Sequence, residues 1–143
     1  MNPIKKIAVF TSGGDAPGMN AAIRAIVRTS LYQNVEVVGV VGGYDGFLNG
    51  DFESLTKGSV ANIIQRGGTI LKTGRSNDFL KPEGRSMAAQ NIKKHQIDGV
   101  VCIGGDGSFA GASALYKEHK IPIVGVPGTI DNDIFGTEYT IGF

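Results

Sequence analysis

Two carboxylates stand two residues apart in the stretch PGTIDND at positions 127–133, which directly follows an apolar run. If this stretch is extended, the side chains of Asp131 and Asp133 point to the same side. Neighbouring carboxylates resist being ionised together, so one can stay basic enough to take a proton from an alcohol while the other orients a substrate or a metal. The pattern predicts proton-transfer chemistry. The alternative is an Asx-turn cluster that only shapes the chain.

Two glycine-rich loops also follow apolar runs: TSGGDAPG at positions 11–18 and GGDGSFAG at positions 104–111. Each loop opens a helical pattern, where unpaired backbone N–H groups can face an anion. Both loops therefore predict phosphate binding. For the first loop, a tight turn that needs glycine only for its backbone geometry is the alternative interpretation.

The second loop carries Asp106 among its glycines, and a carboxylate there can hold Mg²⁺ directly or through water. The same loop matches a looser dinucleotide fingerprint through Gly105, Gly107 and Ala110, so an NAD-binding oxidoreductase domain is a rival. A carboxylate would repel a bare pyrophosphate unless a metal lay between them, which favours metal-bound ATP. The sequence holds no Walker A pattern, which argues against a P-loop fold.

The charge of a bound phosphate must then be neutralised from elsewhere in the chain. Arg75, in KTGRS at positions 72–76, is the candidate, because a guanidinium can bridge two phosphate oxygens and stabilise charge during transfer. A solvated loop arginine is the alternative. The surrounding stretch 72–85 has little apolar periodicity, and we expect it to be a surface excursion.

The elements that must position these residues follow from the apolar pattern. Short continuous apolar runs, typical of a parallel sheet covered on both faces, alternate with helical patterns. We expect one α/β domain over residues 1–143, with a three-layer, Rossmann-like, mostly parallel sheet whose ligands gather at the carboxyl ends of the strands. The expected strands are 7–10, 35–41, 99–103 and 121–126, and the expected helices are 19–31, 60–65, 86–94 and 109–118.

Composition narrows the class of protein. The 143 residues are 41% hydrophobic with a net charge of +1, which offers no global field for nucleic acid or an anionic membrane. Cys102 is the single cysteine and lies in an apolar run, so we expect it to fill the core of a protein from a reducing compartment. The first apolar run is too short for a signal peptide or a membrane span, and we expect a cytoplasmic protein.

Three strings taken together resemble the bacterial ATP-dependent 6-phosphofructokinases: TSGGDAPGMNAA at 11–22, GGDGS at 104–108 and PGTIDND at 127–133. The similarity runs in order from about residue 5 to residue 143, and it covers the N-terminal half of the family's chain. Residues 139–143 look like the start of another structured segment, so we expect the chain to be truncated. The resemblance implies the phosphofructokinase-type α/β fold and a glycolytic kinase, with the fragment alone inactive.

The resemblance also implies roles for single residues. Asp131 would accept the proton of the 1-hydroxyl of fructose 6-phosphate, with Thr129, Ile130 and Asp133 beside the substrate, to give fructose 1,6-bisphosphate and ADP. Asp106 matches the Mg²⁺ position, and Arg75 assists transfer. The positions that match ATP-binding residues are Gly14, Arg75, Ser76, Gly105, Asp106, Gly107 and Ser108.

Two glycines bear on the phosphoryl donor, because the pyrophosphate-dependent branch of the family has Asp where Gly107 stands and Lys where Gly128 stands. A carboxylate at Gly107 would intrude on the α-phosphate of ATP, whereas an ammonium at Gly128 could hold pyrophosphate. Both positions are glycine here, which favours ATP.

Arg24 and Arg28 match arginines of the family's allosteric site for ADP or phosphoenolpyruvate at a subunit contact of a homotetramer. Lys57 stands where the family has a third arginine, and it keeps the charge but loses the bidentate fork. A solvated helix face is the alternative for the two arginines. For the chain as a whole, a regulatory module that binds nucleotide without transferring phosphate is the alternative to an enzyme.

Overall fold

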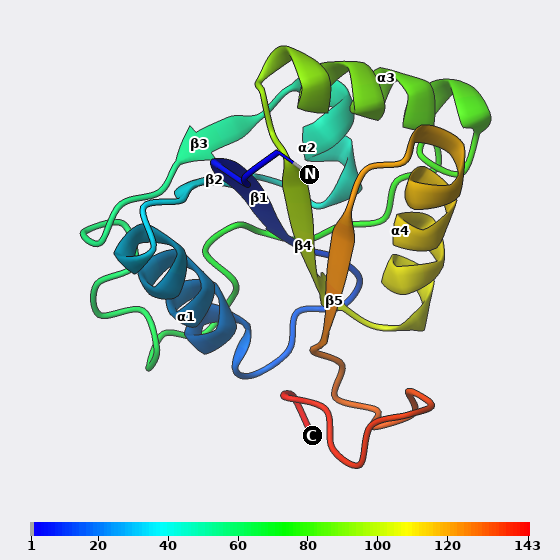
Figure 1. The fold of residues 1–143 in the computed structure, drawn as a ribbon. Coiled ribbons are helices and arrows are strands. Elements are labelled where there is room, and N and C mark those ends of the chain that lie inside the picture. Colours follow the sequence, from blue (N-terminus) through cyan, green and yellow to red (C-terminus); the bar gives the residue numbers. More distant parts are fainter. Residues whose placement is uncertain (1) are drawn as a thin grey trace.

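The computed structural model describes residues 2–143 and shows one five-stranded sheet between helices (Figure 1). The strand order is β3-β2-β1-β4-β5, in which β3 is antiparallel to β2 and all other pairs are parallel. The predicted mostly parallel sheet is therefore confirmed. The strands are β1 (Lys6–Thr11), β2 (Glu36–Val40), β3 (Phe52–Ser54), β4 (Gly99–Gly104) and β5 (Ile123–Pro127).

Helices cover both faces of the sheet. Alternate residues of each strand point to opposite faces, so each strand contributes to two buried clusters. On β1, Ala8 and Phe10 join a buried cluster with α2, α3 and α4, whereas Val9 joins a second cluster with α1 and the stretch 55–71. Figure 1 shows α1 on one side of the sheet and the other three helices on the opposite side. The helices are α1 (Met19–Tyr32), α2 (Tyr44–Asn49), α3 (Pro82–Lys94) and α4 (Asp106–His119).

Three of the parallel strands, β1, β4 and β5, end level with one another. Thr11 pairs with Ile103, and Gly104 pairs with Pro127 in the sheet register. The two glycine-rich loops and the acidic stretch therefore leave the sheet side by side at its carboxyl edge. Figure 1 shows the segment after β5 running below this edge.

The expected helix at 60–65 is wrong, because the chain forms turns there and Asn62 takes a left-handed conformation with φ 55°. Val60 and Ile63 are buried, so the apolar spacing reflects core contacts without a helix. Six residues are too few to make a helix stable without strong support. Among residues 2–143, no helix combines the length and apolar character needed to cross a membrane.

The structure also contains two short elements that the sequence pattern did not predict, α2 and β3. α3 begins at Pro82 instead of residue 86, with the proline in the first turn, where its missing N–H costs nothing. α4 begins at Asp106 instead of residue 109, so the second glycine-rich loop includes the first turn of a helix.

Candidate functional site

A cleft of about 1020 Å³ opens at the carboxyl edge of the sheet. Both glycine-rich loops, the Arg75 stretch and the acidic stretch line it, although they are far apart in the sequence. The cleft brings together every residue predicted for catalysis, substrate or nucleotide: Gly14, Arg75, Ser76, Gly105, Asp106, Gly107, Ser108, Thr129, Ile130, Asp131 and Asp133. Arg24, Arg28 and Lys57 do not line it.

The second glycine-rich loop turns directly into α4. Gly105 is the N-cap of the helix, and no side chain caps it, so the first N–H groups of α4 are free to face an anion. A Cβ at Gly104 would lie 2.5 Å from Ser108 Oγ and 2.8 Å from the Ser12 carbonyl oxygen, so glycine is required there. A Cβ at Gly107 would meet nothing within 4 Å, because that position faces open space.

The acidic stretch is bent, which corrects the expectation of an extended segment. The chain bends at Ile130 and Asp131, and Asn132 is left-handed with φ 48°. The Asn132 amide donates to the Glu138 carbonyl oxygen at 3.1 Å and accepts from the Thr140 N–H at 2.9 Å. Asn132 therefore shapes this loop, whereas the carboxylates of its two neighbours make no hydrogen bond with other described residues.

Thr129 is hydrogen-bonded to the backbone of the predicted base, Asp131. Its hydroxyl oxygen accepts a hydrogen bond from the Asp131 N–H at 3.1 Å, and its carbonyl oxygen accepts one from the Thr140 hydroxyl at 2.6 Å. Asp131 and Asp133 are exposed in the cleft. Their carboxylates are therefore available to a ligand.

The Arg75 stretch is held against the first glycine-rich loop by side chains that the sequence did not single out. Thr73 donates its hydroxyl hydrogen to the Gly13 carbonyl oxygen at 2.7 Å, and Thr11 donates to the Lys72 carbonyl oxygen at 2.8 Å. Arg75 itself is exposed, and within residues 2–143 its guanidinium makes no hydrogen bond or ion pair with another residue. It is free to meet an anion in the cleft.

Asn20 at the start of α1 anchors the chain that leads to Arg75. It is 4% exposed, donates to the carbonyl oxygens of Arg66 and Gly68, and accepts from the Ile70 N–H. Three bonds from one buried amide fix the path of this loop. No local sequence pattern predicts this role, because the hydrogen-bond partners of Asn20 lie about fifty residues away in the chain.

Tyr44 forms part of the cleft wall and links it to the core. Its ring stacks on Phe79 with centroids 3.9 Å apart, and its hydroxyl donates to the Ser108 carbonyl oxygen. Burial raises the pKa of the Tyr44 hydroxyl far above its ordinary value, so the group remains a donor. Nearby Cys102 is fully buried, and burial raises the pKa of its thiol to about 12, which agrees with its predicted place in the core.

The predicted metal position can be compared with its surroundings. Within residues 2–143, no cluster of three or more His, Cys, Asp or Glu side chains could hold a metal by itself. Mg²⁺ is usually bound through one or two carboxylates together with substrate phosphates. The single carboxylate that Asp106 adds to the second glycine-rich loop therefore fits a metal that would arrive with a nucleotide.

The three positions expected to bind an effector lie outside the lining of the cleft, with Arg24 and Arg28 on α1 and Lys57 in the turn after β3. Arg24 is partly buried and donates to the Val60 carbonyl oxygen at 2.7 Å, so it packs against the stretch after β3. Arg28 and Lys57 are exposed. The structure thus separates these positions from the cleft.

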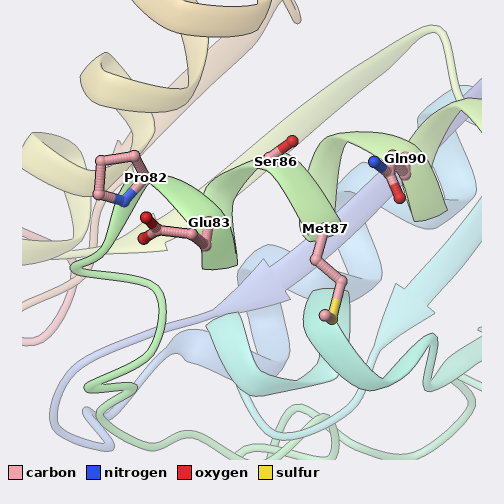
Figure 2. Close-up of a pocket in the computed structure, with 5 residues that line it drawn as sticks. All are labelled: Pro82, Glu83, Ser86, Met87 and Gln90. Atoms are coloured by element: carbon pink, nitrogen blue, oxygen red, sulfur yellow. The ribbon is translucent and has the colours of Figure 1, made fainter.

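A second, shallower hollow of about 430 Å³ lies along α3 (Figure 2). It is lined by Pro82, Glu83, Ser86, Met87 and Gln90. None of these residues was predicted to act, and the hollow holds no cluster of converging polar groups. We assign it no function.

The family model for phosphofructokinase matches residues 6–143. The chain belongs to the phosphofructokinase family. The dinucleotide-like fingerprint after β4 is therefore part of a phosphofructokinase fold. The chain is 60% identical over 140 residues to an ATP-dependent 6-phosphofructokinase of Cytophaga hutchinsonii and 59% identical to one of Thermus thermophilus. It covers 98% of its own length in both matches but only 43% and 44% of these relatives, so it spans under half of their length.

Solved phosphofructokinase structures agree with the fold. The Saccharomyces cerevisiae enzyme superposes with a TM-score of 0.93 at 41% identity over 96% of this chain and 22% of that chain. The T-state Pichia pastoris enzyme gives a TM-score of 0.91 at 40% identity over 99% of this chain and 17% of that chain. A pyrophosphate-dependent phosphofructokinase from Marinobacter aquaeolei shares the fold at 21% identity, with a TM-score of 0.81.

Proposed function

We propose that this chain forms the nucleotide-binding and general-base part of an ATP-dependent 6-phosphofructokinase. One observation carries the proposal: the carboxyl edge of the sheet gathers two glycine-rich loops, a free arginine and the Asp131 carboxylate into one cleft. Relatives at about 60% identity are ATP-dependent 6-phosphofructokinases, which supports the same activity. Since the chain covers under half of those relatives, the remaining contacts to the sugar phosphate would come from other residues.

The reaction follows from these groups. The carboxylate of Asp131 takes the proton from the 1-hydroxyl of fructose 6-phosphate, and the hydroxyl oxygen forms a bond to the γ-phosphorus of ATP. The bond from that phosphorus to the β–γ bridging oxygen breaks, and ADP leaves. Thr129 holds the backbone of the base in place, and Arg75 neutralises charge on the transferring group.

The nucleotide is held by backbone and by charge. N–H groups at the start of α4 and around Gly14 face the phosphates, and Ser76 and Ser108 lie beside them in the cleft. Asp106 would hold Mg²⁺. When bound, this ion neutralises the phosphate oxygens and keeps them aligned.

The two glycines that suggested ATP carry unequal weight in the structure. Gly107 faces open cleft, so an aspartate there would put its carboxylate where the phosphates of ATP are expected. A Cβ at Gly128 would press on Ile103 Cγ2 at 3.0 Å, so a lysine there would first have to displace a core side chain. The preference for ATP therefore rests mainly on Gly107.

The wider setting of the enzyme is part of the same proposal. We place the activity in cytoplasmic glycolysis, in a homotetramer that binds ADP or phosphoenolpyruvate near Arg24, Arg28 and Lys57. Arg28 and Lys57 are exposed and free to meet an anionic effector, whereas Arg24 already bonds to the Val60 carbonyl oxygen. Lysine at position 57 would bind an anion through a single ammonium charge, whereas an arginine could make two parallel hydrogen bonds to it.

The test uses a chimera in which this chain is followed by the C-terminal part of the Cytophaga hutchinsonii relative. We expect a coupled assay to detect fructose 1,6-bisphosphate from MgATP and fructose 6-phosphate, and Asp131→Asn to lower kcat by about a hundredfold or more. Asp78→Asn, which changes an exposed carboxylate outside the base position, is the matched control and should keep full activity. Unchanged activity in Asp131→Asn would remove the proposed base.

A binding experiment separates the alternatives. We expect the chain to bind ADP much more tightly with Mg²⁺ than without it, and Asp106→Asn to abolish that difference. Binding of NAD without a metal would favour the oxidoreductase interpretation. An active-site module that binds MgADP but gives an inactive chimera would favour the nucleotide-binding regulatory function.

A further inference from the structure

Arg85, in the first turn of α3, joins three parts of the cleft wall. Its Nε and Nη2 donate to the two carboxylate oxygens of Glu118 near the end of α4, each at 2.7 Å. Its Nη1 donates to the carbonyl oxygens of Phe79 at 3.0 Å and Leu80 at 2.8 Å. One guanidinium therefore ties the loop before α3 to α4.

These bonds leave Arg85 little to offer a ligand. A guanidinium has five N–H groups, and four hydrogen bonds from Arg85 go to protein oxygens. Its side chain is only 12% exposed, although it lines the cleft. Arg75 is exposed with its guanidinium free, so the two arginines of this wall differ in role.

The loop tied down by Arg85 is the one that carries the free arginine. Ser76 Oγ accepts a hydrogen bond from the Phe79 N–H at 3.1 Å, and the Phe79 ring stacks on Tyr44. Tyr44 in turn donates to the carbonyl oxygen of Ser108 in the second phosphate loop. The loop before α3 is therefore connected to α4 in two ways, through Phe79 and Tyr44 and through Arg85.

We propose that Arg85 and Glu118 form a positioning pair that holds the loop 74–81 against α4, so that Arg75 and Ser76 face the phosphates of a nucleoside diphosphate or triphosphate. The inference rests on the proposed function insofar as a nucleotide occupies the cleft. It adds an ion pair that touches no ligand but sets the width of the nucleotide site. The hydrogen bond between the partners lowers the pKa of Glu118 and raises that of Arg85, so both are charged at neutral pH.

Glu118 provides the sharper test because it does not line the cleft, so a change there removes no contact with a nucleotide. We expect Glu118→Gln to weaken MgADP binding by the chain about tenfold in calorimetry. We also expect faster tryptic cleavage after Arg75, with cooperative thermal unfolding retained. Asp78→Asn is the matched control, since it removes an exposed ion pair with Lys81 from the same loop, and it should change neither readout.

A second variant, Arg85→Lys, keeps the charge but cannot reach the carboxylate and both carbonyl oxygens at once. It should weaken binding to a similar extent, and the double variant should be no worse than either single one, because the two residues act as a unit. Unchanged MgADP affinity and unchanged cleavage in Glu118→Gln would overturn the proposal. Loss of cooperative unfolding in both single variants would also overturn it, by showing that the pair holds the whole fold. If the unaltered chain binds no MgADP, the proposed function fails, while the cleavage readout still decides whether the pair holds the loop.

Discussion

The residues in and around the cleft differ in how far the sequence could predict their roles. The candidate base Asp131 and the loop residue Asp106 stand in short strings of unusual composition, and the sequence alone placed them at one sheet edge. Asn20, Tyr44 and Arg85 act through partners that are distant in the sequence. No local pattern predicts such contacts, because they exist only once the chain has folded.

At the residue scale, the two neighbouring glycines Gly104 and Gly107 give a matched comparison. We expect Gly104→Ala to lower the free energy of unfolding by about 1–3 kcal/mol, because its methyl group would collide with Ser108 Oγ and the Ser12 carbonyl oxygen. The Ser12 backbone cannot yield easily, since its N–H is bonded to Ile103. Urea unfolding measures the change.

Gly107→Ala serves as the control for this comparison, since a Cβ there meets nothing within 4 Å. It should leave stability unchanged or raise it by up to about 1 kcal/mol, because alanine restricts the unfolded chain and favours helix. Equal destabilisation by both substitutions would show that the glycines serve backbone freedom and not space.

At the element scale, the strands and long helices follow the apolar pattern, whereas the connections do not. β1, β4, α1 and α4 were predicted within a few residues of their ends, because each buries a continuous apolar face. In the stretch 55–71 the apolar pattern predicted a helix that does not form, because the buried apolar residues there pack from turns. α2 has only six residues and depends on packing by Tyr44 and Phe47, which no short window reveals.

The start of β1 offers a test of pH dependence at the same scale. Asp98, just before β4, accepts hydrogen bonds from the N–H groups of Lys5 at 2.8 Å and Lys6 at 3.0 Å. These bonds lower the pKa of the Asp98 carboxyl in the folded chain. A depressed carboxyl pKa stabilises the fold above the ordinary value of about 3.9, and the contribution is lost as the pH falls through the folded value.

We therefore expect the unaltered chain to exceed Asp98→Asn in stability by a constant amount at neutral and mildly acidic pH. The difference should shrink as the pH falls below about 4, when the carboxyl binds its proton. Urea unfolding over a pH series measures it. Asp51→Asn, which alters an exposed carboxylate without a hydrogen bond among the described residues, is the control. A difference that stays the same down to the lowest pH would contradict the assignment.

At the scale of the whole molecule, the sequence predicted the fold class and the family, but it did not predict which apolar side chains are exposed on the surface. The segment after β5 exposes five large apolar side chains: Ile130, Phe135, Tyr139, Ile141 and Phe143. Phe135 is fully exposed, and the rings of Tyr139 and Phe143 stack on each other with centroids 6.1 Å apart. So much apolar surface in one segment is unusual for a protein surface that stays bare.

We expect the isolated 143-residue chain to self-associate with rising concentration in sedimentation velocity and to bind a hydrophobic dye. The double substitution Phe135→Ser with Tyr139→Ser should reduce both effects, because it removes the two most exposed aromatic side chains of the segment. Tyr32→Ser is the matched control, since Tyr32 is 86% exposed on the distant end of α1 and stands alone. It should change neither effect. The chimera with the Cytophaga hutchinsonii C-terminal part should bind little dye, because the added chain would cover this segment. If the double variant bound as much dye as the unaltered chain, the dye-binding apolar surface would lie elsewhere. That result would contradict the expectation that the added C-terminal part packs against the segment after β5.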